Sequence, residues 1–229
     1  MVEITGETLA NAIVVLILAA LPSVAWFFQV RKRMIRRQSS LVKLFEQIVK
    51  PRDRRYVVHG YLVGFTAEYW VNRGPIKKVY ITYTTPPYHA FFYLPIIILF
   101  RRREKLEVAV EARDSLGVRG EAHIYRRGGI DVVQLVEKDV KQSPLRRKLQ
   151  RLKLPDLAAE AYATEGDALA VARELWGRLA RLGAVFRVSI VPSRRLVLAV
   201  ASPRPDSFGP VVEEVLSIVQ AAAEKARQV

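Results

Sequence analysis

Twenty-three consecutive residues near the N-terminus, from Thr8 to Val30, carry no charged side chain. As an α-helix they span about 35 Å, which exceeds the roughly 30 Å hydrocarbon core of a bilayer. Aromatic side chains gather at the end of this run, as at a membrane interface. The run therefore predicts a transmembrane helix over residues 8–30. The span residues are Leu9, Ile13, Leu16, Leu21, Trp26, Phe27 and Phe28.

The flanking charges predict how this helix is oriented. The stretch "RKRMIRRQ" follows the run, and Glu3 and Glu7 are the charged side chains before it. The positive-inside rule then puts residues 1–7 outside the cell membrane and the main body in the cytoplasm, as a single-pass protein. Ser23 to Ala25 also fits a signal-peptide cleavage site, but the residues before the run are acidic where a signal peptide is basic. A buried helix of a soluble protein is the third interpretation.

Residues 31–54 continue as a basic amphipathic helix. Met34, Leu41, Phe45 and Ile48 recur at helical spacing, and Pro51 ends the pattern. The apolar face predicts either packing against the body or contact with anionic lipid headgroups.

The apolar period changes to two over residues 55–140. Alternation in "YVVHGYLVGFTAEYWV" and "IKKVYITYT" predicts short strands joined by local turns. Gly128 and Gly129 predict a tight turn into a further strand over residues 130–138. We expect an antiparallel β meander, arranged as a sandwich or a partly open barrel.

The stretch Ala90 to Phe100 allows three interpretations. A second membrane span is disfavoured, because eleven residues form only about 16 Å of helix. A buried strand over residues 93–100 is preferred, with Pro95 at an edge or bulge. The third interpretation is an interfacial loop that dips into the bilayer beside the transmembrane helix. Its contact residues are Tyr88, Phe91, Phe92 and Tyr93.

Basic residues return in the linker 141–155. Leu145, Leu149 and Leu152 have helical spacing, which predicts a short amphipathic helix with a basic face. That face could be solvated or contact nucleic acid or lipid. Its candidate nucleic-acid contacts are Arg146, Arg147, Lys148, Arg151 and Lys153.

Residues 156–229 differ in kind, because helical patterns flank two short apolar strands. We expect an α-β-β-α lobe whose hairpin pairs with itself or extends the main sheet, with both helices on one face. The whole chain is therefore predicted to be α+β.

Charge is distributed unevenly along the chain. The formal net charge is +15, yet acidic and basic residues are equal in number from Pro155 onward. The basic excess of residues 1–154 fits an anionic inner leaflet, where each cation contributes about 1 kcal/mol, or a membrane-held nucleic acid. A solvated surface is the third interpretation, and the many charges with few Met residues hint at a thermophilic source. The candidate membrane-surface contacts are Arg31, Lys32, Arg33, Arg36, Arg37, Arg101, Arg102 and Arg103.

No pattern in the sequence points to catalysis, a metal or a cofactor. The chain has no cysteine, which excludes thiol chemistry and disulfides. Its histidines, His59, His89 and His123, lack the spacing of a zinc site, and we expect them to be structural. His59 and His123 lie on predicted strands that could approach each other.

These observations favour a membrane-anchored binding or scaffold protein. Its basic part would face the membrane, and its neutral C-terminal lobe would meet a protein partner or a second copy. A membrane-tethered nucleic-acid or ribosome-docking protein is the alternative. An enzyme that acts on a lipid or an envelope precursor is the third.

Overall fold

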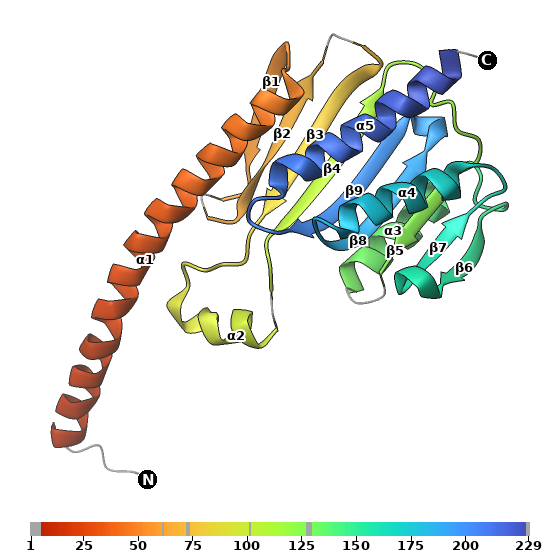
Figure 1. Ribbon diagram of the computed structural model, residues 1–229. Helices are drawn as coiled ribbons and strands as arrows, with labels where there is room; N and C mark the ends of the chain where they lie inside the picture. The colour runs from red at the N-terminus through yellow and green to blue at the C-terminus, as the bar shows by residue number, and fades with distance from the viewer. Residues whose placement is uncertain (1–5, 61, 72–73, 101, 127–129, 228–229) are drawn as a thin grey trace.

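The computed structural model describes residues 6–60, 62–71, 74–100, 102–126 and 130–227 (Figure 1). The helices of five or more residues are α1 (Gly6–Val49), α2 (Leu94–Leu99), α3 (Ile130–Gln142), α4 (Ala168–Ala180) and α5 (Phe208–Arg227). The strands are β1 (Asp53–Val58), β2 (Gly64–Trp70), β3 (Ile76–Thr84), β4 (Lys105–Ala112), β5 (Ala122–Tyr125), β6 (Gln150–Leu154), β7 (Ala159–Ala163), β8 (Gly183–Val191) and β9 (Leu196–Pro203). Short 3₁₀ turns are η1 (Phe91–Tyr93), η2 (Pro155–Leu157) and η3 (Pro192–Arg194).

The described strands form one nine-stranded sheet in the order β1-β2-β3-β4-β9-β8-β5-β7-β6. Every neighbouring pair is antiparallel. The α+β prediction is confirmed, and β1 to β4 form the expected antiparallel meander, within one open sheet rather than a sandwich or a barrel. The hairpin of β8 and β9 lies in the middle of the sheet, between β4 and β5. Strands β1 and β6 form the two edges of the sheet. The helices cover the apolar face in place of a second sheet.

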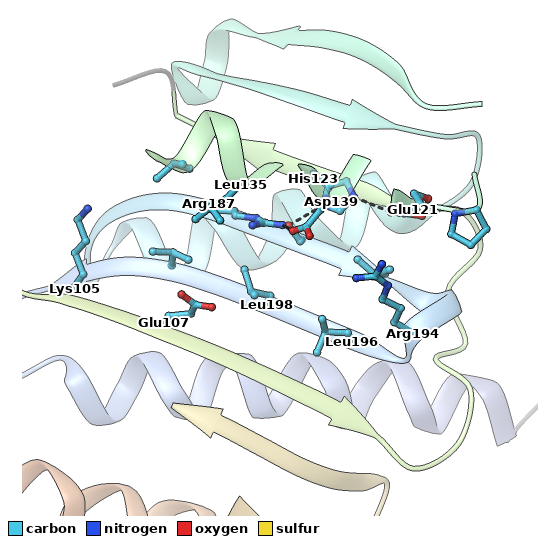
Figure 2. Close-up of a pocket in the computed structure, with 16 residues that line it drawn as sticks. Lys105, Glu107, Glu121, His123, Leu135, Asp139, Arg187, Arg194, Leu196 and Leu198 are labelled. Carbon is cyan, nitrogen blue, oxygen red and sulfur yellow. Dashed lines mark hydrogen bonds and ion pairs between the residues drawn. The ribbon is translucent and has the colours of Figure 1, made fainter. Parts of the chain in front are cut away.

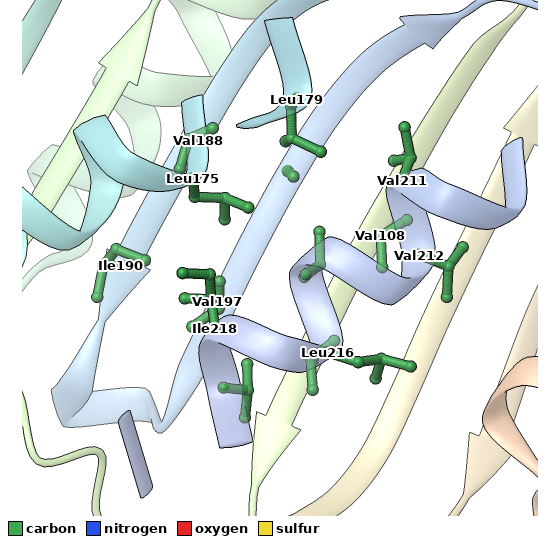
Figure 3. Close-up of a cluster of buried hydrophobic side chains, with 14 of the residues drawn as sticks. Val108, Leu175, Leu179, Val188, Ile190, Val197, Val211, Val212, Leu216 and Ile218 are labelled. Atoms are coloured by element: carbon green, nitrogen blue, oxygen red, sulfur yellow. The ribbon is translucent and has the colours of Figure 1, made fainter. Parts of the chain in front are cut away.

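The main core lies between the sheet and a layer of helices on one face (Figure 3). Alternate residues of the central strands, such as Val108, Val188 and Val197, point toward α4 and α5 and are at most 1% exposed. Leu175 of α4 and Val212 of α5 meet them there. Both C-terminal helices therefore cover the same face, as expected from the sequence.

Helix α3 covers part of the opposite face. Tyr125 of β5 packs there with Val132 and Val136, forming a small second cluster. The predicted strand over residues 130–138 is wrong, because Val132, Val136 and Val140 repeat at the spacing of a helix rather than a strand. The predicted turn at Gly128 and Gly129 lies outside the described residues.

Helix α1 is exposed in its N-terminal part and buried against the body at its C-terminal end. It runs without interruption for 44 residues, with Pro22 inside it, and projects from the body (Figure 1). Leu41, Phe45 and Val49 at its C-terminal end are buried in the main core, so residues 41–49 pack on the body. The helix ends where Lys50 adopts a left-handed conformation, φ 48°, because the residue before Pro51 is disfavoured in a right-handed helix.

The preferred interpretation of residues 93–100, a buried strand, is wrong. They form the end of η1 and the short helix α2. Strand β3 pairs with β2 and β4, and β4 with β3 and β9, so neither offers a free edge to another strand. Pro95 suits the first turn of a helix, where its missing N–H leaves no hydrogen bond unmade.

The predicted basic helix in the linker is also wrong. Residues 144–148 form turns, and residues 150–154 form β6, which pairs with the outer edge of β7. Pro144 and Pro155 enclose too few residues for a helix that stands alone. Pairing with β7 satisfies the backbone of this segment instead.

A β-β-α unit occurs twice in the second half of the chain, as β6-β7-α4 and as β8-β9-α5. Both hairpins turn in the same way, with a 3₁₀ turn that begins with proline. In each, the residue after the 3₁₀ turn is left-handed, Ala158 at φ 48° and Arg195 at φ 54°. The first unit forms one end of the sheet and the second forms its centre.

Candidate functional site

The segment between β3 and β4 leaves the sheet and docks on α1 (Figure 1). The indole Nε1–H of Trp26 donates a hydrogen bond of 2.8 Å to the backbone oxygen of Tyr88. The ring of Phe91 lies 6.3 Å from that of Trp26, and the ring of His89 lies 6.1 Å from that of Phe27. We call residues 86–100 the docked segment. It joins α1 at the end of the predicted membrane span.

The docked segment exposes most of its apolar side chains. Phe92 is 72% exposed, Ile98 75%, Leu99 77% and Phe100 67%, whereas Ile97 is buried. The N-terminal part of α1 is likewise exposed, with Leu16 at 68%. Apolar side chains gathered in this way mark a surface that meets a membrane or another protein. This arrangement matches the interfacial-loop interpretation of the sequence.

Basic side chains lie next to these apolar surfaces. On α1 they follow the predicted span in sequence, and after the docked segment they precede β4. Exposed basic residues in these two places are Arg31, Lys32, Arg33, Arg36, Arg102 and Arg103. Arg37 pairs with Glu104 at 2.6 Å, which ties α1 to the start of β4. Arg101 lies outside the described residues.

The other predicted basic group is not part of this surface. Arg146, Arg147 and Lys148 are exposed in the turn before β6, which is the sheet edge opposite β1. Arg151 forms an ion pair with Glu160, with Nη2 2.7 Å from Oε2. Lys153 is exposed on β6. The two groups of basic residues predicted to bind membrane and nucleic acid therefore lie on separate surfaces.

A buried polar network lies under α3, on the face of the sheet opposite α4 and α5 (Figure 2). Nδ1 of His123 lies 2.9 Å from Oγ of Ser189, and Nε2 lies 2.8 Å from Oε1 of Glu121. The Ser143 hydroxyl donates to the other Glu121 oxygen at 2.6 Å. Nε–H of Arg187 donates to Ser189 at 2.9 Å. Strand register brings these side chains together, because His123 pairs directly with Ser189.

The pKa values of two carboxyl groups on this face are shifted in opposite directions. Burial by itself raises the pKa of Glu121, but hydrogen bonds from His123 and Ser143 outweigh it and hold the pKa below its usual value. Burial raises the pKa of Glu107 on β4, and the charge of Arg187 only partly opposes this. Arg187 also pairs with Asp139 of α3. Glu121 is therefore stabilised as a carboxylate, whereas Glu107 is stabilised in its neutral form.

Ser189, His123 and Glu121 are linked in this order, as in a proton relay. Ser189 is 1% exposed and His123 0%, although both line one wall of a cavity on this face of the sheet. The Ser189 oxygen also accepts from Arg187. The network satisfies polar groups that burial would otherwise penalise.

Sequence reasoning missed this network and treated His123 as an isolated residue. A usable signal existed, because Glu121 and His123 alternate on one strand and Arg187 and Ser189 alternate on another. Only the pairing of β5 with β8 reveals that the two polar faces meet. His59 is elsewhere, at the end of β1, with Nε2 2.6 Å from the Thr66 hydroxyl. The suggested approach of His59 to His123 is therefore wrong.

Within the described ranges, no group of three or more His, Asp or Glu side chains could hold a metal ion. One helix there, α1, is long and apolar enough to cross a membrane, judged by its length and composition. No protein-family model matches the chain, and no curated protein matches it. Function must therefore be argued from these surfaces.

Proposed function

We propose that this is a single-pass membrane-anchored binding protein that holds its α+β body flat against the inner surface of the cell membrane. The N-terminus is outside, α1 crosses the bilayer, and the docked segment inserts into the interface as a second contact. The outer faces of α4 and α5, in the electrically neutral part of the chain, then face a protein partner or a second copy.

The observation that carries this proposal is the docking of residues 86–100 on α1. Trp26 and Phe27 hold the segment at the end of the apolar run. Phe92, Ile98, Leu99 and Phe100 remain exposed. Two apolar contacts at separate points restrict the tilt of the body, which one helix alone would leave free. The neighbouring Arg and Lys side chains suit anionic headgroups.

The depth of the docked segment in the bilayer is the first test. Because the chain has no cysteine, a nitroxide can be placed at Leu99→Cys in the full chain reconstituted in anionic vesicles. We expect this label to be accessible to oxygen dissolved in the bilayer and protected from a water-soluble nickel complex. Val58→Cys on β1, also an exposed apolar residue at 55%, is the matched control and should show the aqueous pattern. An aqueous pattern at position 99 would contradict the proposal.

Orientation is tested with an impermeant maleimide on intact bacterial spheroplasts. Gly6→Cys should react before the membrane is opened, and Ser193→Cys, in the exposed 3₁₀ turn η3, only afterwards. The reverse order would mean that the body lies outside.

The nucleic-acid alternative makes a different prediction. A structured RNA would bind the full chain with an affinity that falls steeply with salt, and the loss of Arg146, Arg147 and Lys148 would remove that binding. Salt-dependent RNA binding together with an aqueous label at Leu99→Cys would favour this alternative.

A further inference from the structure

A cavity opens on the sheet face opposite α5, between α3 and strands β4, β9 and β8 (Figure 2). Its volume is about 450 Å³, within the range of roughly 300–1,000 Å³ typical of small-molecule sites. It lies on the same face as the polar network and is distinct from the docked segment. Its properties do not depend on how the protein meets the membrane.

The floor of the cavity is apolar. Leu196, Leu198 and Val200 are alternate residues of β9, so they point to the same face, and each is only partly buried. Leu135 of α3 faces them from the other side and is 53% exposed. An apolar ligand could cover these side chains without displacing the main core, which lies on the opposite face of the sheet.

The polar wall offers unused cationic groups. The Arg187 side chain is only 7% exposed. Its Nε and Nη2 bind Ser189 and Asp139, but Nη1 has no hydrogen-bond partner among the described residues. Arg194 borders the same cavity, is exposed, and has no ion pair in the described part of the chain. Lys105 stands at the other end, with Nζ 5.6 Å from the centre of the Phe186 ring.

The acidic side chains of the wall do not neutralise these cations fully. Asp139 is bound to Arg187, and Glu121 to His123 and Ser143. The charge of Arg194 acts on Glu121 without forming an ion pair in the described part of the chain. Glu107 has no hydrogen-bond or ion-pair partner among the described residues, so it does not occupy the donor groups of Arg187. Arg194 and Nη1 of Arg187 therefore remain for an incoming anion.

We propose that this cavity binds a small amphipathic anion, whose apolar body lies on Leu196, Leu198 and Val200 and whose carboxylate or phosphate group meets Arg187 and Arg194. A free fatty acid and a single-chain phospholipid fragment share this chemistry. A hydrocarbon chain matches the continuous apolar floor, and the buried guanidinium gives the preference for an anion.

Calorimetric titration of the full chain in lipid nanodiscs tests the proposal, with empty nanodiscs as the background. The probes are octanoate, octyl phosphate, octanol and octylammonium, which share one tail and differ in the headgroup. We expect saturable binding of one or both anions, at least about tenfold tighter than that of octanol or octylammonium. A preference for octyl phosphate would identify a phospholipid-type ligand, and a preference for octanoate a fatty-acid type. Equal binding of octylammonium, or no saturable binding of either anion, would overturn the proposal.

Paired variants locate the site. Leu198→Trp should fill the cavity and abolish binding, whereas Glu68→Trp, on the same sheet face but on β2, should leave it unchanged. Arg194→Gln should weaken binding of the anions about tenfold without affecting octanol. Arg55→Gln is the control, because it removes the same charge from an exposed position on β1, at the sheet edge away from the cavity. Arg194 is exposed, so its replacement tests the site even if Leu198→Trp disturbs folding. Binding that survives both Leu198→Trp and Arg194→Gln would refute this location.

Discussion

Glu107 and Glu121 line the same cavity but respond differently to pH. The pKa of Glu107 is raised, first by burial and then by the charge of Asp139, against the opposing charge of Arg187. A raised folded-state pKa contributes stability below the unfolded value of about 4.3, and that contribution is lost as pH rises through the folded value. At neutral pH the Glu107 carboxylate therefore destabilises the fold.

Glu107→Gln is accordingly expected to raise the melting temperature of the body at pH 7 to 8. The difference from the unmodified chain should shrink and disappear as pH falls below about 4. Calorimetric melting of both full chains across this pH range measures the difference in melting temperature. A lower melting temperature for the variant at pH 8 would mean that Lys105 or Arg187 stabilises the carboxylate more than burial penalises it.

Glu121 should behave in the opposite way. Although burial by itself raises its pKa, its hydrogen bonds lower it overall. Its contribution to stability is present above about pH 4.3 and is lost as pH falls through the folded value. Glu121→Gln should therefore lower the free energy of unfolding at pH 7 by roughly 1–3 kcal/mol, with a smaller loss in acid. A loss that is the same at all pH values would show that shape, rather than charge, matters at this position.

At the scale of an element, the repeated hairpin turn makes a prediction about backbone conformation. Ala158 is left-handed, a conformation that is unfavourable for every residue with a Cβ atom and that glycine adopts readily. Ala158→Gly should raise the free energy of unfolding by about 0.5–1 kcal/mol. Ala163→Gly, in the adjacent strand β7, is the control and should lower it, because Ala163 is extended and buried. Chemical denaturation of both variants measures these free energies of unfolding. Destabilisation by Ala158→Gly would contradict the left-handed conformation of Ala158.

At the scale of the whole molecule, α1 makes the anchor and the core a single structure. Phe45 is fully buried in the core, and Phe28 on the same helix is 60% exposed. Phe45→Ala should therefore lower the free energy of unfolding by about 3–5 kcal/mol. Phe28→Ala should leave the stability of the body almost unchanged. Thermal melting in nanodiscs compares the two, and equal effects would mean that α1 and the body are not coupled in this way.

This coupling also bears on the proposed function. Because α1 enters the core without a flexible linker, the tilt of α1 in the proposed membrane would also set the tilt of the sheet. The ion pair between Arg37 and Glu104 and the docked segment add two further ties between α1 and the body. The cavity, on the face opposite α5, is therefore held in a defined orientation to α1.

Several features could be read from the local pattern of the chain. The uncharged run 8–30, the α-β-β-α order of the last third and the strands β2, β3 and β4 each carry a hydrophobic period of their own. Such periods are local properties, so neighbouring residues are enough to reveal them. The burial of Leu41 and Phe45 followed in the same way from a one-sided apolar helix.

Three elements were misassigned where local preference and tertiary context disagree. Residues 93–100 are apolar enough for a strand, but no sheet edge is free to pair with them. Residues 150–154 form a strand because β7 offers them such an edge. The valines of α3 favour a strand, yet their spacing lets them pack on Tyr125 as a helix.

The sequence by itself determined the long apolar N-terminal helix, the α+β composition and the uneven charge, because these depend on which residues are neighbours in the chain. Only the tertiary structure decided the sheet order, the docking of residues 86–100 on Trp26 and the cavity beside Arg187. Each of these joins residues that are distant in the chain, such as His123 with Ser189. Strand pairing brings them together, and no local period records which strand pairs with which.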